Sequence, residues 1–326
     1  MISNLNPQSQ RFLADLARVQ ERIDSASRQI TSGKRVNVAS DAPDVISELL
    51  QLRATLYRNT QITANLSVAQ TDANLSESAL SSATQLMDRA VTLAAQGATG
   101  TMDTAGRLSL ANEVQAIQEQ MVSYSQTQSA GRFVFSGDRE TVPAYRIDLT
   151  NANYGVDASG NVNGDGTGTG AGVDRLINPM TATRVVESPV GGTFLVSQTA
   201  QQIFDNRNPD DTLATDNVFA ALNSLRTALL NNDAGAVNTS IGSLKQASDH
   251  LNTALSFYGT VQNRLQGAVN SAANYDLQIR TQISQKEDAD VVAASLELSQ
   301  GTTHLQASFQ MEARIPRTSL FDFLAP

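Results

Sequence analysis

The sequence predicts a mainly α-helical fold: a bundle of long helices built from the N- and C-terminal segments, with a terminal coiled coil and a small, central β-rich insert. Two observations lead to this prediction. Apolar residues recur in steps of four and three through both ends of the chain, which is the repeat of a helix that packs along a partner helix. Between residues 131 and 200 this repeat gives way to short alternating runs and many glycines, which are typical of strands and turns.

The first expected helix has one narrow apolar seam and clear ends. The residues of the seam are Phe12, Leu16, Val19, Ile23, Ala26 and Ile30. Gly33 follows the seam, and glycine commonly ends a helix because it adopts the left-handed conformation without strain. A second helix is expected to begin at Pro43, because proline suits a first helical turn and Ser40 or Asp41 can cap exposed amides there.

The second expected helix is some 50 residues long, about 75 Å at about 1.5 Å per residue. Mostly apolar residues recur every seven positions along it: Leu52, Asn59, Leu66, Ala73, Leu80, Met87 and Ala94. A glycine-flanked break at 97–106 precedes a third helix over 110–124. Helical spacing returns near Val218, continues through 251–283, and reappears in a last helix over 291–309.

Helices with a single narrow seam need a partner to cover it, which suggests three domains. We expect residues 1–40 and 285–326 to pair as a terminal coiled-coil assembly domain, and residues 41–130 and 201–284 to form a long-helix bundle. Residues 131–200 would form a β-rich, Gly-rich insert domain, placed as a knob at the far end of the bundle. On this pattern alone, the protein can be either a monomeric or dimeric bundle or a subunit of a polymer.

The composition argues against several classes of function. Only 5% of the residues are aromatic although 40% are hydrophobic, so a compact enzyme with an aromatic core is not expected. The net charge of −9 argues against nucleic-acid binding, because that affinity comes largely from neutralising phosphates. Cysteine is absent and His250 and His304 are the only histidines, which leaves little material for disulfides, zinc sites or Ser-His-Asp catalysis. No secretory signal and no membrane-length apolar run is visible.

Two short motifs resemble ligand-binding loops but fail on spacing. Thr31–Lys34 is similar to the end of a phosphate-binding loop, yet Arg28 stands where glycine is required and Arg35 where serine or threonine is required. Asn161–Gly166 is similar to the start of a calcium loop, yet the twelfth position holds Gly172 in place of a bidentate glutamate. A helix end and ordinary turn chemistry explain these motifs better.

An acidic cluster near the end of the chain is the remaining candidate for chemistry. Glu287, Asp288 and Asp290 stand together in a helical stretch without a histidine nearby, so we expect a solvated turn or a salt-bridging face. The sequence therefore predicts that the protein is not an enzyme, and it offers no catalytic, cofactor-binding or metal-binding residue.

The boundaries of the long helices resemble those of the bacterial flagellins and the flagellar hook-associated proteins related to them. The similar stretches are Ile30–Val36, Ser40–Pro43, Asn65–Leu80, Gly100-Thr101 with Arg107, Gly131–Gly137, Glu287–Asp290 and Ser319–Leu324. The resemblance covers roughly residues 1 to 140 and 215 to 326 and leaves the insert unmatched. Within the family, the Ser-Asp-Ala-Pro helix start and the Leu-Phe-Asp-Phe-Leu ending look most like the hook-filament junction proteins, with filament-forming flagellin as the alternative.

The resemblance implies a structural subunit that joins hook to filament and templates flagellin assembly. It also implies export through the flagellar type III channel without a cleaved signal peptide, and a final location in the extracellular part of the flagellum. The implied partners are further copies of the chain in a ring or helical oligomer, the hook-side hook-associated protein 1, flagellin and a flagellar export chaperone. Neither nucleic acid nor membrane insertion is implied.

We expect the assembly interface to use apolar residues of the two terminal helices and the C-terminal segment. These residues are Phe12, Leu16, Val19, Ile23, Ile30, Leu298, Leu305, Phe309, Leu320, Phe321 and Leu324. Packing inside one subunit is the alternative role for them. Two other classes of protein stay open: a calcium-dependent adhesin that acts through the insert, and a needle or tip protein of a helical export apparatus.

Overall fold

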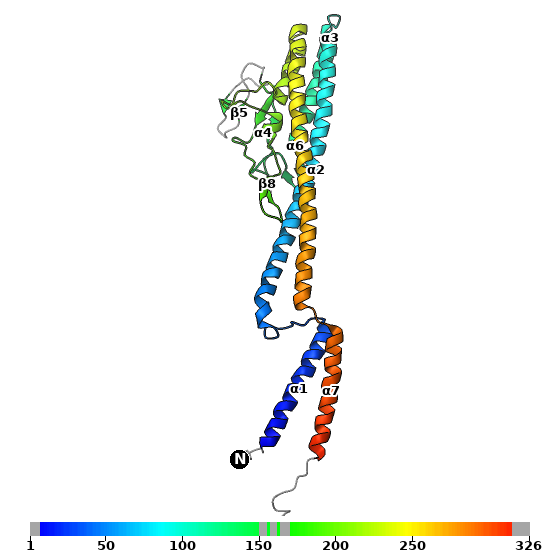
Figure 1. The fold of residues 1–326 in the computed structure, drawn as a ribbon. Helices are drawn as coiled ribbons and strands as arrows, with labels where there is room; N and C mark the ends of the chain where they lie inside the picture. The colour runs from blue at the N-terminus through cyan, green and yellow to red at the C-terminus, as the bar shows by residue number, and fades with distance from the viewer. Residues whose placement is uncertain (1–6, 150–154, 157–161, 164–169, 315–326) are drawn as a thin grey trace, which may run out of the picture. The chain divides into compact units, whose positions relative to one another are not determined.

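The computed structural model describes residues 7–149, 155–156, 162–163 and 170–314. It is mainly helical with a β-rich middle, as the sequence predicts (Figure 1). The helices are α1 (Pro7–Ser32), α2 (Pro43–Gly97), α3 (Thr104–Ser125), α4 (Ala200–Phe204), α5 (Val218–Leu230), α6 (Ala234–Glu287) and α7 (Val291–Arg314). None of these helices is long and apolar enough, within the described residues, to cross a membrane.

The middle of the chain holds short antiparallel strands. They are β1 (Gln128–Ser129), β2 (Arg132–Phe133), β3 (Tyr145–Ile147), β4 (Gly155–Val156), β5 (Val162–Asn163), β6 (Val173–Arg175), β7 (Val185–Glu187) and β8 (Thr193–Leu195). β1 pairs with β2, β7 pairs with β8, and the remaining strands form a sheet in the order β3-β6-β5-β4.

The helix boundaries follow the punctuation in the sequence. α1 ends at Ser32, and Gly33 takes a φ of +69°, so the segment that resembles a phosphate loop is a helix end. α2 begins at Pro43, as predicted. The expectation that Asp41 caps the first amides of α2 is wrong. The Asp41 carboxylate accepts hydrogen bonds from the amides of Asn37 and Val38, which precede it, at 2.8 and 2.9 Å. Asp41 therefore closes the turn before α2.

The chain divides into two compact units. We call the first the terminal unit, Met1–Asn59 with Asn274–Pro326, and the second the central unit, Thr60–Ala273. The central unit has one large hydrophobic core that includes residues of α2, α3, α5, α6 and the β-rich segment. The heptad position of α2 points into this core, with Leu66, Ala73, Leu80, Met87 and Ala94 buried.

The β-rich insert packs against the helices of the central unit and shares their core. Figure 1 shows it along the side of α2 and α6, so the expectation of a knob at the far end is wrong. The reason is a group of aromatic rings that joins the insert to the helices: Phe135, Tyr145, Phe204, Phe219 and Tyr258, all buried. Successive rings lie 5.1 to 6.2 Å apart between centroids. Five of the sixteen aromatic residues of the chain are thus gathered where the insert meets the helices.

Candidate assembly surface

In the terminal unit, α1 and α7 pack against each other, as predicted from their seams (Figure 1). Small residues are buried where the two helices pack: Ala26, Ala294 and Gly301. A Cβ atom on Gly301 would lie 2.7 Å from Cγ1 of Ile23, which is too close for a real contact. Small residues therefore set the distance between the two helices.

The large apolar residues predicted as an assembly interface are left incompletely covered. Phe12, Leu16, Val19, Ile23, Ile30, Leu298 and Leu305 are half-buried. Phe309 is 54% exposed. Leu320, Phe321 and Leu324 lie outside the described residues. A hairpin of two helices covers each seam from one side only, so the α1 and α7 seams stay partly open.

The structure adds exposed apolar residues on α7 that the sequence analysis missed. Val292 is 81% exposed, and Leu296, one helical turn later, is exposed as well. Residues four apart lie on one face of a helix, so these two side chains form a patch separate from the seam that faces α1. The spacing of four is visible in the sequence, on the side of the helix opposite the seam.

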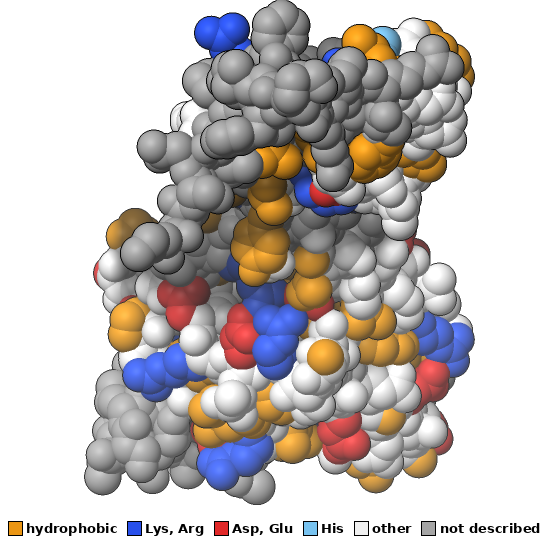
Figure 2. Space-filling view, turned by 90° about the horizontal axis from the view of Figure 1, so that it is seen from below, with side chains coloured by type: hydrophobic (Ala, Val, Ile, Leu, Met, Phe, Trp, Pro, Cys, Tyr) orange, Lys and Arg blue, Asp and Glu red, His pale blue; other side chains and the backbone are white. Residues whose placement is uncertain are grey.

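A second group of missed residues lies on α2 within the terminal unit. Leu50 and Tyr57 are seven residues apart and exposed, Tyr57 at 69%, whereas the neighbouring Leu49 is buried. α2 is therefore apolar on an outer line as well as on the inner heptad line. Figure 2 shows hydrophobic side chains at the surface, in orange, mixed with charged ones. Uncovered apolar residues of this kind mark contact surfaces when they are grouped.

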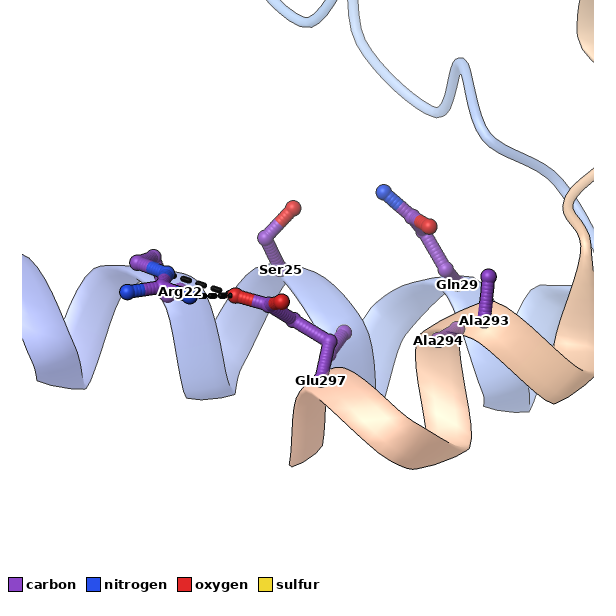
Figure 3. A pocket seen from close by; sticks show the side chains of 7 residues that line it. Arg22, Ser25, Gln29, Ala293, Ala294 and Glu297 are labelled. Carbon is purple, nitrogen blue, oxygen red and sulfur yellow. Dashed lines mark hydrogen bonds and ion pairs between the residues drawn. The ribbon is translucent and has the colours of Figure 1, made fainter. Parts of the chain in front are cut away.

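A groove of about 340 Å³ lies between α1 and α7 (Figure 3). Its lining is small and polar: Arg22, Ser25, Ala26, Gln29, Ala293, Ala294 and Glu297. An ion pair between Arg22 and Glu297 crosses from one helix to the other beside it. The lining offers no nucleophile with a neighbouring base. Its one positive and one negative side chain, Arg22 and Glu297, cancel in charge.

The linkers at the base of the two helices meet at a buried carboxylate. Glu287, the last residue of α6, has a side chain only 4% exposed and forms ion pairs with Lys34 and Arg53. The Arg53 Nη2 to Glu287 Oε2 distance is 2.7 Å. Burial raises the pKa of Glu287, but hydrogen bonds from Lys34 and Arg53 outweigh burial and hold that pKa below its ordinary value. Of the expected acidic cluster, Glu287 forms ion pairs and is not solvated, whereas Asp288 and Asp290 accept hydrogen bonds at exposed positions.

Main-chain hydrogen bonds reinforce this meeting point. The amides of Arg35 and Val36 donate to the carbonyl of Glu287 at 2.7 and 3.3 Å, and the amide of Ala289 donates to the carbonyl of Gly33 at 2.9 Å. Lys34 and Asp288 form an antiparallel bridge. The α1–α2 linker and the α6–α7 linker are thus zipped together over a few residues.

The other candidate residues show no arrangement for chemistry. His250 contacts the Gln202 carbonyl at 2.8 Å and Asp216 at 3.1 Å, and His304 is exposed on α7. The candidate calcium motif lies outside the described residues except for Val162 and Asn163. In the part of the chain that the structure describes, no group of three His, Cys, Asp or Glu side chains is placed to hold a metal ion.

Comparison with known proteins matches both ends of the chain to one family. The profile of the bacterial flagellin N-terminal helical region matches residues 2–140, and that of the bacterial flagellin C-terminal helical region matches residues 241–324. Together these matches cover about two thirds of the chain.

Individual relatives extend the match across the insert. The flagellar hook-associated protein 3 of Escherichia coli strain K12 is 26% identical over 311 residues, and that of Salmonella typhimurium strain LT2 is 25% identical over 312 residues, each over 90% of both chains. The solved structure of a putative flagellar hook-associated protein from Vibrio parahaemolyticus has the same fold, with a TM-score of 0.60 and 19% identity over 76% of this chain and all of that one. The chain belongs to the bacterial flagellin family, alongside hook-associated proteins that match it over nearly its whole length.

Proposed function

We propose that this protein is a structural subunit of the bacterial flagellum that forms the junction between hook and filament and templates flagellin assembly. The relatives that match 90% of the chain are hook-associated proteins, which favours the junction over a filament-forming flagellin. The role requires no catalysis.

The observation that carries the proposal is the incomplete burial of the α1–α7 seam. Seven large apolar residues remain half-buried and Phe309 is mostly exposed, although these helices have 26 and 24 residues. Helices that lack a closed apolar face are marginal in water. Neighbouring copies that cover the open side would order and stabilise them, so that folding of the hairpin is completed by assembly.

The contact between copies is head-to-tail. One surface of each subunit must bind a different surface of the next subunit. A two-fold contact binds the same surface to itself and stops at a dimer, whereas contacts between unlike surfaces generate rings and helical tubes. The half-buried α1–α7 residues and the Val292–Leu296 patch are two such surfaces on one hairpin. On the proposed role, hook-associated protein 1 contacts the hook side of the assembly and flagellin the filament side.

Delivery follows from the same role. The protein would be exported through the flagellar type III channel without cleavage of a signal peptide, with a flagellar chaperone bound beforehand, and would end in the extracellular flagellum. A chain without cysteine needs no disulfide chemistry on this route.

A deletion strain tests the proposal. Without the gene, cells should keep hooks, lose filaments and motility, and release flagellin into the medium, and a plasmid copy should restore filaments. Normal filaments on the deletion strain would contradict the junction role. Immunogold labelling separates the two flagellar alternatives, because a junction protein gives one band at the hook end and a flagellin gives continuous label.

A further inference from the structure

The meeting point of the two linkers in the terminal unit has a property that assembly alone does not explain: it is held by charge. Its apolar cluster is small, with Val36, Ala42 and Leu49 buried. Beside this cluster lies the Glu287 carboxylate, almost wholly buried, whereas the Lys34 and Arg53 side chains that pair with it are about half exposed. The Glu287 carboxylate is thus buried, and the ammonium of Lys34 and the guanidinium of Arg53 reach it from the surface.

Each cation comes from a different segment. Lys34 belongs to the linker after α1, Arg53 to α2, and Glu287 to the end of α6. One carboxylate near the end of the chain therefore connects two segments from its beginning, and the main-chain hydrogen bonds of Arg35, Val36 and Ala289 lie directly beside it. Removing one partner of a buried ion pair leaves the other uncompensated, which is much more costly than losing an exposed pair.

We propose that Glu287 is a charge-operated clasp, which holds the α1–α2 and α6–α7 linkers together in the free subunit and releases them when its carboxylate is neutralised. When the clasp is closed, the two linkers are held together. α1 and α7 then start side by side, so that their apolar seams can pack against each other. Open, the clasp leaves the linkers to the main-chain hydrogen bonds, the exposed polar contacts of Lys286, the small apolar cluster and the α1–α7 contacts. The clasp is a property of the single subunit and does not depend on the proposed role in the flagellum.

The charged groups around the clasp set the direction of its response to pH. Besides Lys34 and Arg53, the Arg35 guanidinium donates to the Lys286 carbonyl, Lys286 pairs with the exposed Glu48, and Asp288 accepts a hydrogen bond from Ser284. Because the pKa of folded Glu287 is lowered from its ordinary value of 4.5, the clasp is fully closed above that value and opens as the pH falls through the lowered one.

Amide hydrogen exchange on the full-length protein tests the clasp. At pH 7, Glu287→Gln should lower the protection factors of the Arg35, Val36 and Ala289 amides at least tenfold. Amides of α3 in the central unit should change less than twofold. Titrating the unaltered protein below pH 4.5 should reproduce the loss at the same three amides, with protection factors corrected for intrinsic exchange at each pH.

Glu48→Gln is the matched control. It makes the same change from carboxyl to amide, on a residue of the same unit whose pair with Lys286 is exposed at the surface, and it should change the three protection factors less than twofold. The proposal is overturned if Glu287→Gln lowers them less than tenfold, if Glu48→Gln has an equal effect, or if protection is lost in α3 at the same time, which would mean that the whole chain unfolds. Because the experiment uses free subunits, filaments on a deletion strain would leave its result unaffected.

Discussion

The central and terminal units are built on helices of similar kind, yet they bury their apolar residues very differently. In the central unit, Leu66, Leu80 and Phe219 are completely buried. Among the described side chains of α1 and α7, the buried ones are Ala26 and Ala294, at 3% and 4% exposure, and the large apolar residues around them stay half-covered. Helix length is thus not what closes a core. A third layer covers the central helices, and the described part of the terminal hairpin has none.

The polar groups of the α1–α7 hairpin differ from those of the central unit in the same sense. In the central unit, the buried carboxylate of Asp205 accepts hydrogen bonds from Tyr145, Arg207 and Asn217 at 3.0, 2.8 and 2.7 Å. On the terminal hairpin, the pair of Arg18 with Asp15 is largely exposed, and such pairs contribute only about 0–1 kcal/mol. The central unit closes its own core, whereas the described residues of the hairpin leave large apolar side chains half-covered.

The largest expected effect comes from removing an aromatic ring of the central core. Phe219→Ala should lower the free energy of unfolding by about 3–5 kcal/mol, because it deletes a fully buried ring and leaves a cavity. Chemical denaturation followed by circular dichroism measures it. The control is Phe309→Ala on the terminal hairpin, where the ring is mostly exposed, with an expected change below about 1 kcal/mol. Equal costs at the two positions would remove the distinction between the units.

A charge placed on the hairpin should block assembly and spare the central unit. Leu305→Asp and Phe309→Asp should each reduce incorporation into isolated flagella more than tenfold, because a carboxylate would be buried among apolar residues of a neighbouring copy. The central unfolding transition should shift by less than about 0.5 kcal/mol. Asn252→Asp, on an exposed position of α6, is the control and should assemble normally. Normal incorporation of both apolar-to-Asp variants would refute the interface.

A pair of glycine substitutions makes a smaller, sharper comparison. Gly267→Ala, where a Cβ meets open space, should stabilise the central unit by about 0.5–1 kcal/mol, because alanine is the better helix former. Gly301→Ala should bring no such gain, since its Cβ would displace Ile23 and separate α1 from α7. Helix content and denaturation of both variants measure this. A gain at Gly301 equal to that at Gly267 would show that α1 and α7 do not need their close contact.

The smallest effect expected is a loss of stability at alkaline pH confined to the central unit. Burial first, and then the neighbouring Asp205 carboxylate, raise the pKa of Tyr145 well above 10.0. A raised folded pKa means that the contribution to stability is present below the unfolded value and is lost as the pH rises beyond it. Unfolding free energies should therefore fall from pH 9.5 upward, and Tyr145→Phe should flatten that slope. An unchanged slope in this variant would assign the loss to other groups.

Much of this fold was predictable because local chemistry decides it. Gly33 ends α1 and Pro43 begins α2 through backbone preferences that hold in any context, and the heptad line of α2 points inward because it is the longest apolar line on that helix. The pairing of α1 with α7 followed from two narrow seams that needed a partner.

The features that could not be predicted depend on contacts between distant parts of the chain. Nothing local distinguishes Glu287 from Asp288, yet only the former is buried, because Lys34 and Arg53 reach it from two other segments. The aromatic cluster could not be predicted for the same reason, since Phe135 lies near the start of the insert and Phe219 lies in α5, beyond its end. The break between α5 and α6 contains Asn232, which has a φ of +53°. It contains no glycine or proline from which a helix end could be predicted.

We propose that neighbouring copies cover the open side of the α1–α7 hairpin. Because the chain contains no cysteine, a single Phe309→Cys variant can be labelled with a maleimide in the free subunit and in intact flagella. Val190→Cys, on an exposed turn of the central unit, shows that the reagent reaches the assembled protein. We predict that Cys labelling at position 309 is rapid in the free subunit and at least tenfold slower in flagella. Equal rates in the two states would contradict the account.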